Sequence, residues 1–284
     1  AEFAVTVDGL ENPYHTMAFY VMPGEVLEVN APANSRLESS SMNVKALDNA
    51  DWQLVAPQKP GLYTVRVIHP SYPQTMTLNM FVLRPATEIR NGMLNGYRIG
   101  EYPKEPFRGL ASYRPPKGFI EAHKDVLDTK VSPHFTLRQF LCKQSFKGDK
   151  QYLVLREELL IKLETILKAV NERGIRTDSF YIMSGYRTPY YNKAIGNRKY
   201  SRHIYGGAAD IFIDVSPKDG RMDDLNQDGK VDKRDANFLY NLVEKLSQRS
   251  WWPSTGGLGQ YGSNSGHGPF VHVDSRGYRA RWGK

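Results

Sequence analysis

Several features are scarce in this sequence, and each absence narrows the class of protein. The 284 residues include one cysteine, so no disulfide can form within the chain. Cys142 stands in an apolar stretch, which indicates a buried and unreactive thiol. No apolar run approaches the roughly 18 residues of a membrane-spanning helix, so we expect no transmembrane segment. Internal repeats and low-complexity tracts are absent.

The chain has an excess of basic residues, which are not concentrated in any one segment. It has 38 Lys and Arg against 30 Asp and Glu, a formal net charge of +8. A basic balance is typical of proteins that bind nucleic acid, an anionic membrane or an acidic polymer. The basic residues are dispersed, and no nucleic-acid motif is present, so we expect no nucleic-acid partner. An anionic polymer fits the charge, although charge alone does not select it.

The N-terminal third reads as β-structure. Over residues 1–85, short β-rich segments alternate with turn signals such as Pro23-Gly24 and Pro60-Gly61. Residues 62–67 alternate between apolar and polar with period two. This spacing predicts a small, all-β antiparallel sandwich, immunoglobulin-like in architecture, that binds substrate or a partner and carries no catalytic cluster. The opening residues AEFAV are compatible with the end left by removal of a secretory segment.

The remainder is predicted as a linker and an α+β domain. Residues 86–125 are rich in Pro, Gly and Tyr and read as a linker, followed by a second domain over residues 126–284. One helix is predicted from Tyr152 to Arg173, because apolar residues form a single stripe that Gly174 ends. Another amphipathic helix is predicted from Asp235 to about Gln248.

A pattern of metal-ligand residues occupies the second domain. Residues 201–210 follow S-x-H-x-x-G-x-A-x-D, with His203 and Asp210 as candidate ligands. Asp210 interrupts an apolar run that predicts a buried strand, where a carboxylate is costly unless it is paired or binds a metal. In residues 270–274, alternation places His272 on one face with Asp274. Two His and one carboxylate with an open fourth position are typical of a catalytic zinc site.

These residues resemble the LAS group of zinc metallopeptidases, named for lysostaphin, D-Ala-D-Ala carboxypeptidase and sonic hedgehog. The SGYRTP segment at residues 184–189 is similar to the one that carries a substrate-facing arginine in the carboxypeptidase branch. The resemblance covers about residues 126–284. It implies an α+β zinc peptidase domain, with an antiparallel sheet and helices, that acts as a DD-endopeptidase or DD-carboxypeptidase on peptidoglycan. It also implies an exported protein, periplasmic or attached to the cell envelope, and we expect a monomer.

The resemblance also implies roles for individual residues. Arg187, sixteen residues before His203, would hold the substrate, because its planar fork suits a carboxylate. Family members often carry an acidic residue or His shortly before the last ligand, but Pro269 and Phe270 stand there and cannot transfer protons. His267 is the favoured acid/base, and Asp274 is the alternative, as a base or as an orienter of a ligand His. Further residues predicted to contact substrate or line the cleft are Ser201, Tyr186, Tyr205 and Tyr200.

A second metal motif lies between the predicted catalytic strands. Residues 224–235 match a twelve-residue calcium loop, with a glycine at the sixth position for the sharp turn. The helix that would precede the loop is missing, so we expect a half EF-hand with a structural calcium. The alternative is an acidic, solvated turn. The predicted ligands are Asp224, Asn226, Asp228, the Lys230 carbonyl, Asp232 and Asp235.

Two other functions remain open. A pseudo-enzyme that keeps zinc and binds cell wall or a partner is supported by the missing base at Pro269. A secreted peptidase for ordinary proteins is less favoured because of the segment around Arg187. A digest of murein distinguishes the pseudo-enzyme from the peptidase.

Overall fold

The computed structural model describes all 284 residues, which fold into two compact units. The predicted linker is not a separate element, because its two ends belong to the first unit and its middle to the second. We call residues 98–115, the middle of that linker, the strap. The first unit comprises residues 1–97, 116–138 and 147–152, and the second comprises residues 98–115, 139–146 and 153–284.

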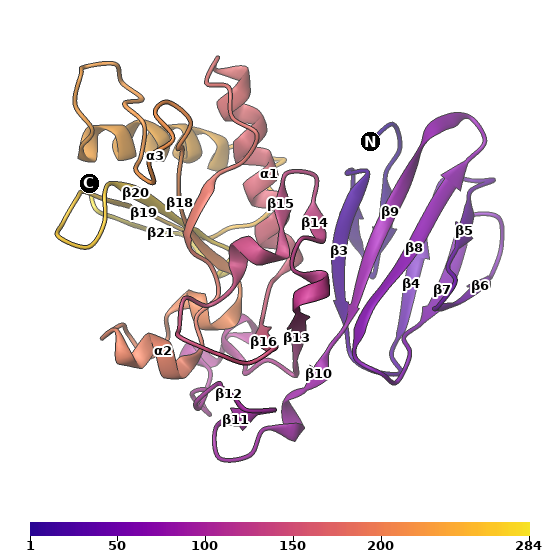
Figure 1. The fold of residues 1–284 in the computed structure, drawn as a ribbon. Coiled ribbons are helices and arrows are strands. Elements are labelled where there is room, and N and C mark those ends of the chain that lie inside the picture. The colour runs from indigo at the N-terminus through magenta and orange to yellow at the C-terminus, as the bar shows by residue number, and fades with distance from the viewer. The chain divides into compact units, whose positions relative to one another are not determined.

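Two sheets form the N-terminal part of the first unit, where alternating residues are buried as the period-two pattern requires. One is antiparallel throughout, with the strand order β2 (Leu10–Asn12), β1 (Val5–Val7), β4 (Val26–Asn30), β7 (Asp51–Val55) and β6 (Asn43–Ala46). The other has the order β3 (Thr16–Val21), β9 (Tyr72–Val82), β8 (Gly61–His69) and β5 (Arg36–Glu38). In this sheet β3 and β9 pair in parallel, which departs from the antiparallel arrangement expected from the sequence. Figure 1 shows these strands in indigo and purple.

The rest of the first unit is built from short strands around a buried carboxylate. Glu121 of β13 contacts Arg84 at 2.8 Å, Lys150 at 3.2 Å and the Tyr152 hydroxyl at 3.0 Å. These contacts join segments far apart in the sequence, which is why the ends of the predicted linker fold here. The strands are β10 (Arg84–Pro85), β13 (Gly118–His123) and β16 (Lys150–Leu153), with the pairs β11 (Met93–Leu94) and β12 (Tyr97–Arg98), and β14 (Lys130–Ser132) and β15 (Phe135–Thr136). Three 3-10 turns connect them: η1 (Ala86–Glu88), η4 (Lys124–Val126) and η5 (Leu137–Phe140).

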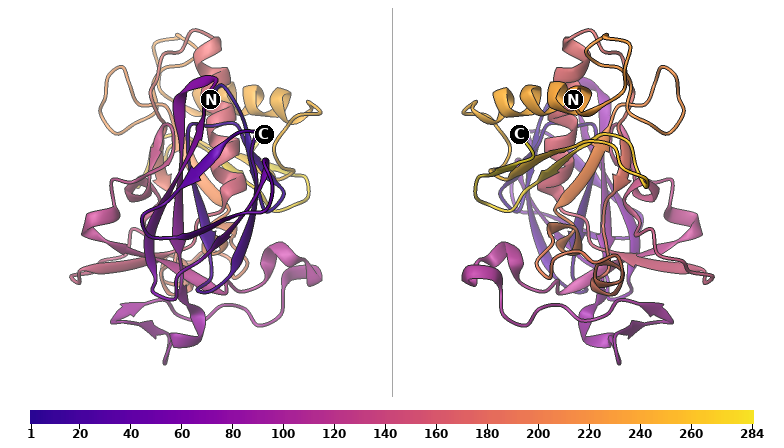
Figure 2. Two further views of the ribbon diagram at one scale, coloured as in Figure 1. Left: turned by 90° about the vertical axis from the view of Figure 1, so that its right-hand side faces the viewer. Right: turned by 90° about the vertical axis from the view of Figure 1, so that its left-hand side faces the viewer.

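The second unit is α+β, as predicted. Its sheet has the order β17 (Tyr181–Ser184), β18 (Ala208–Phe212), β20 (Phe270–Asp274), β19 (Gly257–Tyr261) and β21 (Ala280–Trp282), antiparallel except for the parallel pair β19–β21. Helix α3 (Lys233–Ser247) packs on β19 and β20 and contacts α1 (Glu157–Glu172). Figure 2 shows α1 and α3 running in different directions. Shorter elements are α2 (Pro189–Ala194), η2 (Phe107–Gly109), η3 (Ala111–Tyr113) and η6 (Arg202–Tyr205).

The two main helices form where the apolar stripes predicted them, with shifted starts. Helix α1 begins at Glu157 and not at Tyr152, because residues 150–153 pair as strand β16. The whole predicted stripe of α1 is buried. Helix α3 begins at Lys233, since Asp232 is its N-cap and Asp235 completes a capping box.

The strap is held to the second unit by side chains along its length. The Tyr102 hydroxyl donates to the Ile204 carbonyl at 2.7 Å and lies 2.8 Å from the Tyr186 hydroxyl. Further along, the Ser112 carbonyl accepts a hydrogen bond of 2.6 Å from Arg202. The strap is therefore packed against the rest of the second unit and is not a free linker.

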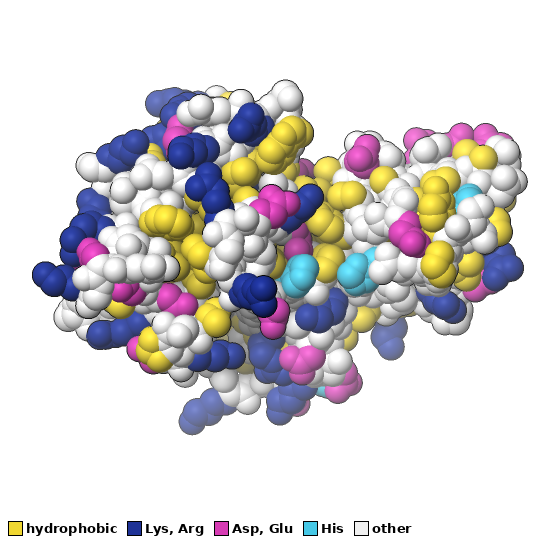
Figure 3. Space-filling model, turned by 90° about the horizontal axis from the view of Figure 1, so that it is seen from above, with side chains coloured by type: hydrophobic (Ala, Val, Ile, Leu, Met, Phe, Trp, Pro, Cys, Tyr) yellow, Lys and Arg dark blue, Asp and Glu magenta, His cyan; other side chains and the backbone are white.

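Charged side chains are spread over the surface. On the face in Figure 3, Lys and Arg are scattered among acidic and uncharged side chains and do not gather in one patch. None of the helices combines the length and apolar character that crossing a bilayer requires.

Candidate active site

The candidate site is organised along one row of the second sheet. The strand register pairs Ser184 with Asp210, Asp210 with His272, and His272 with Gly259. Gly259 in turn pairs with Trp282. Paired residues in adjacent strands share a face of the sheet, so this row brings residues nearly a hundred positions apart into contact.

His203 reaches the same row from the turn before β18. It lies in η6, which ends at Gly206 with φ +71°, a conformation that glycine adopts readily. A side chain at Gly206 would also meet the Val154 carbonyl oxygen at 2.3 Å, so the motif needs glycine here for two reasons. The His203 Nδ1 lies 2.7 Å from the Gly185 carbonyl and donates to it, which leaves Nε2 as the free ligand atom.

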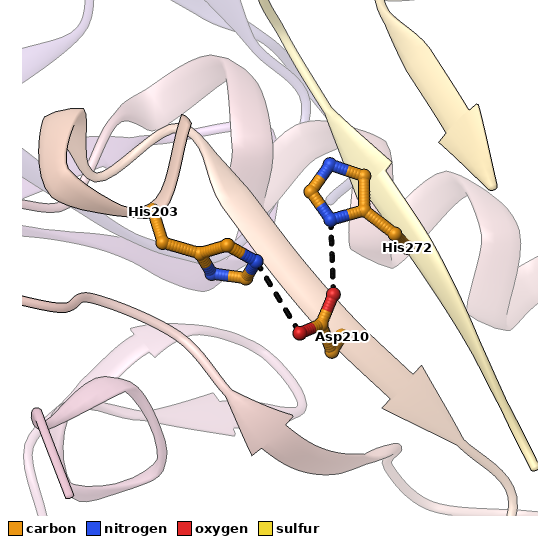
Figure 4. A group of neighbouring side chains, drawn as sticks. All are labelled: His203, Asp210 and His272. Atoms are coloured by element: carbon orange, nitrogen blue, oxygen red, sulfur yellow. Dashed lines mark hydrogen bonds and ion pairs between the residues drawn. The ribbon is translucent and has the colours of Figure 1, made fainter. Parts of the chain in front are cut away.

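The three predicted zinc ligands converge. The His203 Nε2 lies 3.3 Å from one oxygen of Asp210, and the His272 Nδ1 lies 2.9 Å from the other. Figure 4 shows the two imidazoles pointing at the carboxylate from either side. One ligand atom from each residue falls within 4.8 Å of the others, and all three side chains are buried. Two imidazole nitrogens and a carboxylate oxygen are a donor set that suits zinc.

Asp274 lies behind His272 and not in the pocket. Its carboxylate is fully buried and contacts the His272 Nε2 at 2.7 Å. It also accepts from the Gly257 amide at 2.8 Å and from the Arg276 guanidinium at 2.6 Å. These contacts occupy the carboxylate and fix the imidazole with Nδ1 toward Asp210. This placement fits the orienting role considered for Asp274, and its role as a catalytic base stays a prediction.

The charges of the site depend on one another. Burial alone would lower the pKa of His272, but its hydrogen bonds to Asp210 and Asp274 raise that pKa to about 9. Burial lowers the pKa of His203, with Arg187 acting in the same direction. Burial would raise the pKa of Asp210, yet the two imidazoles bring it far below its usual range. Zinc binding therefore has to displace a proton from His272.

Arg187 lies beside the ligand carboxylate. Its Nε donates to the Ser184 hydroxyl at 2.8 Å and its Nη2 to Asp210 at 3.1 Å, while its backbone amide bonds the His203 carbonyl. These bonds fix the guanidinium at the pocket wall and leave Nη1 as a further donor.

A pocket of about 1220 Å³ opens over the three ligands. Asp210 is the one carboxylate among its lining residues. The cations that line it are Arg187, Arg198, Lys199, Arg202 and Arg276. Such a charge balance favours an anionic ligand.

His267 also lines the pocket, on the loop that leads into β20. Its Nδ1 lies 2.7 Å from the Gly268 carbonyl and donates to it, so Nε2 carries the lone pair. Its ring packs edge-on against Phe270, 4.9 Å between centroids. Apart from the two ligand histidines, it is the one imidazole at the pocket.

The structure separates the other predicted contact residues into two groups. Ser201 and Tyr200 line the pocket. Tyr186 and Tyr205 do not, because both rings are almost fully buried in the core. The strap explains this difference, since Tyr102 packs on Tyr205, 5.9 Å between ring centroids, and lies in hydrogen-bonding range of Tyr186.

Several residues that line the pocket were not predicted from the sequence, and Tyr261 and Trp282 are two of them. The Trp282 ring lies 5.1 Å from the His272 ring, and its Nε1 donates to the Tyr261 hydroxyl at 2.7 Å. Burial raises the pKa of Tyr261, and the charge of Asp210 adds to this. No local motif marks either residue. What links them to the site is the strand pairing, in which Gly259 lies opposite His272 on one side and Trp282 on the other. This pairing becomes known only when the strands are placed in a sheet.

The acidic loop at residues 224–235 has a different construction. Both oxygens of Asp224 accept loop amides, those of Asp228 at 3.2 Å and Gly229 at 2.8 Å. Asp235 accepts the amides of Leu225 and Asn226 with one oxygen and that of Asp232 with the other. In addition, the Arg234 guanidinium contacts Asp228 at 2.6 Å and Asp232 at 2.7 Å. The sharp turn at Gly229, φ +80°, fits a calcium loop, but the carboxylates are engaged by the protein itself.

A comparison with known families bears on the same part of the chain. The family model described as Peptidase M15 matches residues 133–230, which is 98 of the 284 residues. The matched segment contains Arg187, His203 and Asp210 and ends before His272. No match was found among curated proteins or among solved structures. Over this segment the chain is similar to M15 peptidases, which supports a zinc-dependent metallopeptidase.

Proposed function

We propose that this protein hydrolyses peptide bonds beside D-amino acids in bacterial peptidoglycan, with zinc held by His203, Asp210 and His272. The observation that carries the proposal is the convergence of these three buried ligands at the floor of one pocket. A buried carboxylate favours a nearby cation, and two imidazole nitrogens with one carboxylate oxygen are a donor set that suits zinc.

Zinc bound there would act as a Lewis acid on the peptide carbonyl and would acidify a water. His267 is the group at the pocket that can take the proton from the attacking water through Nε2. A bond forms between the water oxygen and the carbonyl carbon, the carbon–nitrogen bond breaks, and the same proton passes to the leaving amine. Arg187 binds the carboxylate of the substrate through its remaining donor and keeps the peptide in register.

The charge of the pocket supports a peptidoglycan substrate. Stem peptides carry free carboxylates, and the pocket offers Arg198 and Lys199 at exposed positions in addition to Arg187. An enzyme of this specificity acts where murein is, in the periplasm or at the cell envelope. Both a DD-endopeptidase and a DD-carboxypeptidase fit, because each cuts a bond that precedes a D-residue.

Mass analysis of muropeptides tests the proposal. Purified murein and isolated stem peptides are incubated with zinc-loaded protein, with chelator-treated protein, and with treated protein after zinc is restored. We expect products that appear with zinc, disappear with chelator and return on restoration. Loss of a terminal D-residue identifies a carboxypeptidase, and conversion of cross-linked dimers to monomers identifies an endopeptidase. Unchanged muropeptides with fully zinc-loaded protein contradict the proposal.

A second candidate is a zinc-containing module that binds cell wall or a partner without turnover. It is favoured by one observation, the absence of an acidic residue or His at positions 269 and 270. Sedimentation with murein sacculi separates the two candidates. A module binds sacculi and leaves their muropeptides unchanged, whereas an enzyme changes them.

We also propose a structural calcium in the loop at residues 224–235, supported by the ligand spacing and the turn at Gly229. Arg234 would have to leave Asp228 and Asp232 for the ion to bind. The test adds calcium to protein whose metals were stripped and whose zinc was then restored, so that only the loop responds. Ligand binding to the folded state should raise the melting temperature, and Asp228→Ala should abolish the rise. An unchanged melting temperature in both proteins identifies an acidic turn.

A further inference from the structure

Tyr261 stands on the same face of the sheet as the zinc ligands. It lies two residues beyond Gly259, and strand residues two apart share a face. Gly259 is paired with His272, so the Tyr261 ring projects beside the ligand row, opposite Phe270. The two rings are stacked, 4.4 Å between centroids with an interplanar angle of 7°. Tyr261 is also among the residues that line the pocket.

Trp282 fixes the orientation of the Tyr261 hydroxyl. An indole nitrogen can only donate, so in the 2.7 Å bond the tyrosine oxygen is the acceptor. The hydroxyl proton is then left to donate to another group. The absence of a side chain at Gly259 permits this arrangement, because a Cβ there would come within 2.2 Å of the indole ring.

The same indole connects the hydroxyl to the metal ligands. The Trp282 ring lies 5.1 Å from the His272 ring, and its Nε1 donates to the Tyr261 hydroxyl. A neutral donor is thus held in the pocket that the three ligands also line, by the stacked ring of Phe270 and the indole of Trp282, and the absence of a side chain at Gly259 leaves room for that indole. Nothing in the zinc site or in the acid/base role of His267 requires this construction.

We propose that Tyr261 donates a hydrogen bond to the carbonyl oxygen of the bond being cut as that oxygen gains negative charge. This inference rests on the proposed peptidase function. A preoriented donor contributes most where negative charge develops in the transition state. Tyr261 is then a catalytic residue, and Trp282 is the residue that positions it.

The variant Tyr261→Phe removes the hydroxyl and keeps the stacked ring. We expect kcat to fall about 10²–10³-fold, the usual effect of losing one oxyanion donor, with KM and zinc content unchanged. A phosphinate analogue of the cleaved dipeptide carries the charged oxygens of the transition state. Its affinity, measured by calorimetry on zinc-loaded protein, should fall about 10–100-fold in Tyr261→Phe. Trp282→Phe should lose part of the same affinity, because the hydroxyl remains but its anchor is gone.

Tyr181 provides a matched control. It stacks on Phe212 at 4.5 Å and 12°, in the same sheet, and does not line the pocket. Tyr181→Phe should therefore change neither kcat nor phosphinate affinity. The inference is overturned if Tyr261→Phe binds the phosphinate as tightly as wild type, if wild type does not bind it, or if the loss falls on KM alone. Binding that depends on Tyr261 without cleavage of any muropeptide would instead overturn the substrate assignment and leave the donor role standing.

Discussion

The second unit contains two clusters that read as metal sites from sequence, and the structure builds them in opposite ways. His203, Asp210 and His272 come from a turn and two strands, and tertiary pairing brings their ligand atoms within 4.8 Å. The loop at residues 224–235 is contiguous, and its carboxylates mainly accept the amides of the loop itself. One cluster has side chains converging on each other, and the other has side chains turned back onto their own backbone.

This difference teaches what makes a ligand pattern informative. A carboxylate in a tight turn finds amide donors nearby, so its charge is satisfied without a cation. Asp210 lies in a fully buried strand whose amides are committed to the sheet, so it depends on side chains brought from elsewhere. Spacing in sequence describes both clusters equally well. The origin of the partners separates them, because the zinc ligands meet side chains from other elements and the loop carboxylates mainly accept amides of the loop itself.

The largest effect should come from removing a zinc ligand. His203→Ala and His272→Ala should each lose zinc, and turnover should fall by about 10³-fold or more, since the metal contributes several kcal/mol to the transition state. Metal analysis and muropeptide turnover measure both. Asp224→Ala, the matched change in the loop, should keep full zinc and activity. Full zinc content in both histidine variants would show that these residues do not hold the metal, and the contrast between the ligand cluster and the acidic loop would fail.

Removing His267 separates proton transfer from metal binding. His267→Ala should retain one zinc per chain, because the residue is not a ligand, while turnover falls about 10²–10⁴-fold. Near-normal turnover in this variant, together with an inactive Asp274→Asn that still holds zinc, would move the base to Asp274.

Asp274 and Asp235 form a matched pair of fully buried carboxylates, one behind each cluster. Asp274→Asn should weaken zinc affinity about 10–100-fold, because His272 loses the partner that orients it. Asp235→Asn should leave zinc affinity unchanged and lower the free energy of unfolding by about 1–2 kcal/mol through the lost cap. Competition with a chelating dye and denaturant unfolding measure the two quantities. Equal zinc affinity in the two variants would show that Asp274 does not support the zinc site more than Asp235 does.

The last effect, on stability alone, concerns Lys162, which donates to the backbone carbonyl of Asp274 at 2.5 Å. Burial lowers the pKa of Lys162 to about 8. Between that pH and about 10.5 the unfolded chain holds a proton that the folded chain has lost, so this residue makes stability rise with pH in that window. Lys162→Met should stabilise the protein by about 1–3 kcal/mol at pH 7, and the gain should shrink toward pH 10. The difference between variant and wild type in urea unfolding isolates the effect, and a gain that does not vary with pH would contradict it.

Local patterns predicted the parts of this protein that depend on local forces. The apolar stripe of α1 and the period-two alternation of β8 are set by neighbours in sequence, and both elements formed. The short spacing from His203 to Asp210 is also local, because it covers only the turn η6 and the start of the next strand, β18. The partnership of Gly259 with Trp282, the burial of Tyr186 and Tyr205, and the orienting place of Asp274 depend on strand register and on the strap. Such long-range pairings leave no periodic trace in the sequence.

The path of the chain between its two units has a consequence for how the protein can be divided. It passes from one unit to the other at five points, near residues 97, 115, 138, 146 and 152. Each unit is made of three separate segments, so no single truncation of the chain yields one complete unit without parts of the other. A fragment beginning at residue 126 would lack the strap, and with it Phe107 and Tyr113 from the pocket wall. Domain exchange and truncation experiments on this protein therefore have to keep both units together.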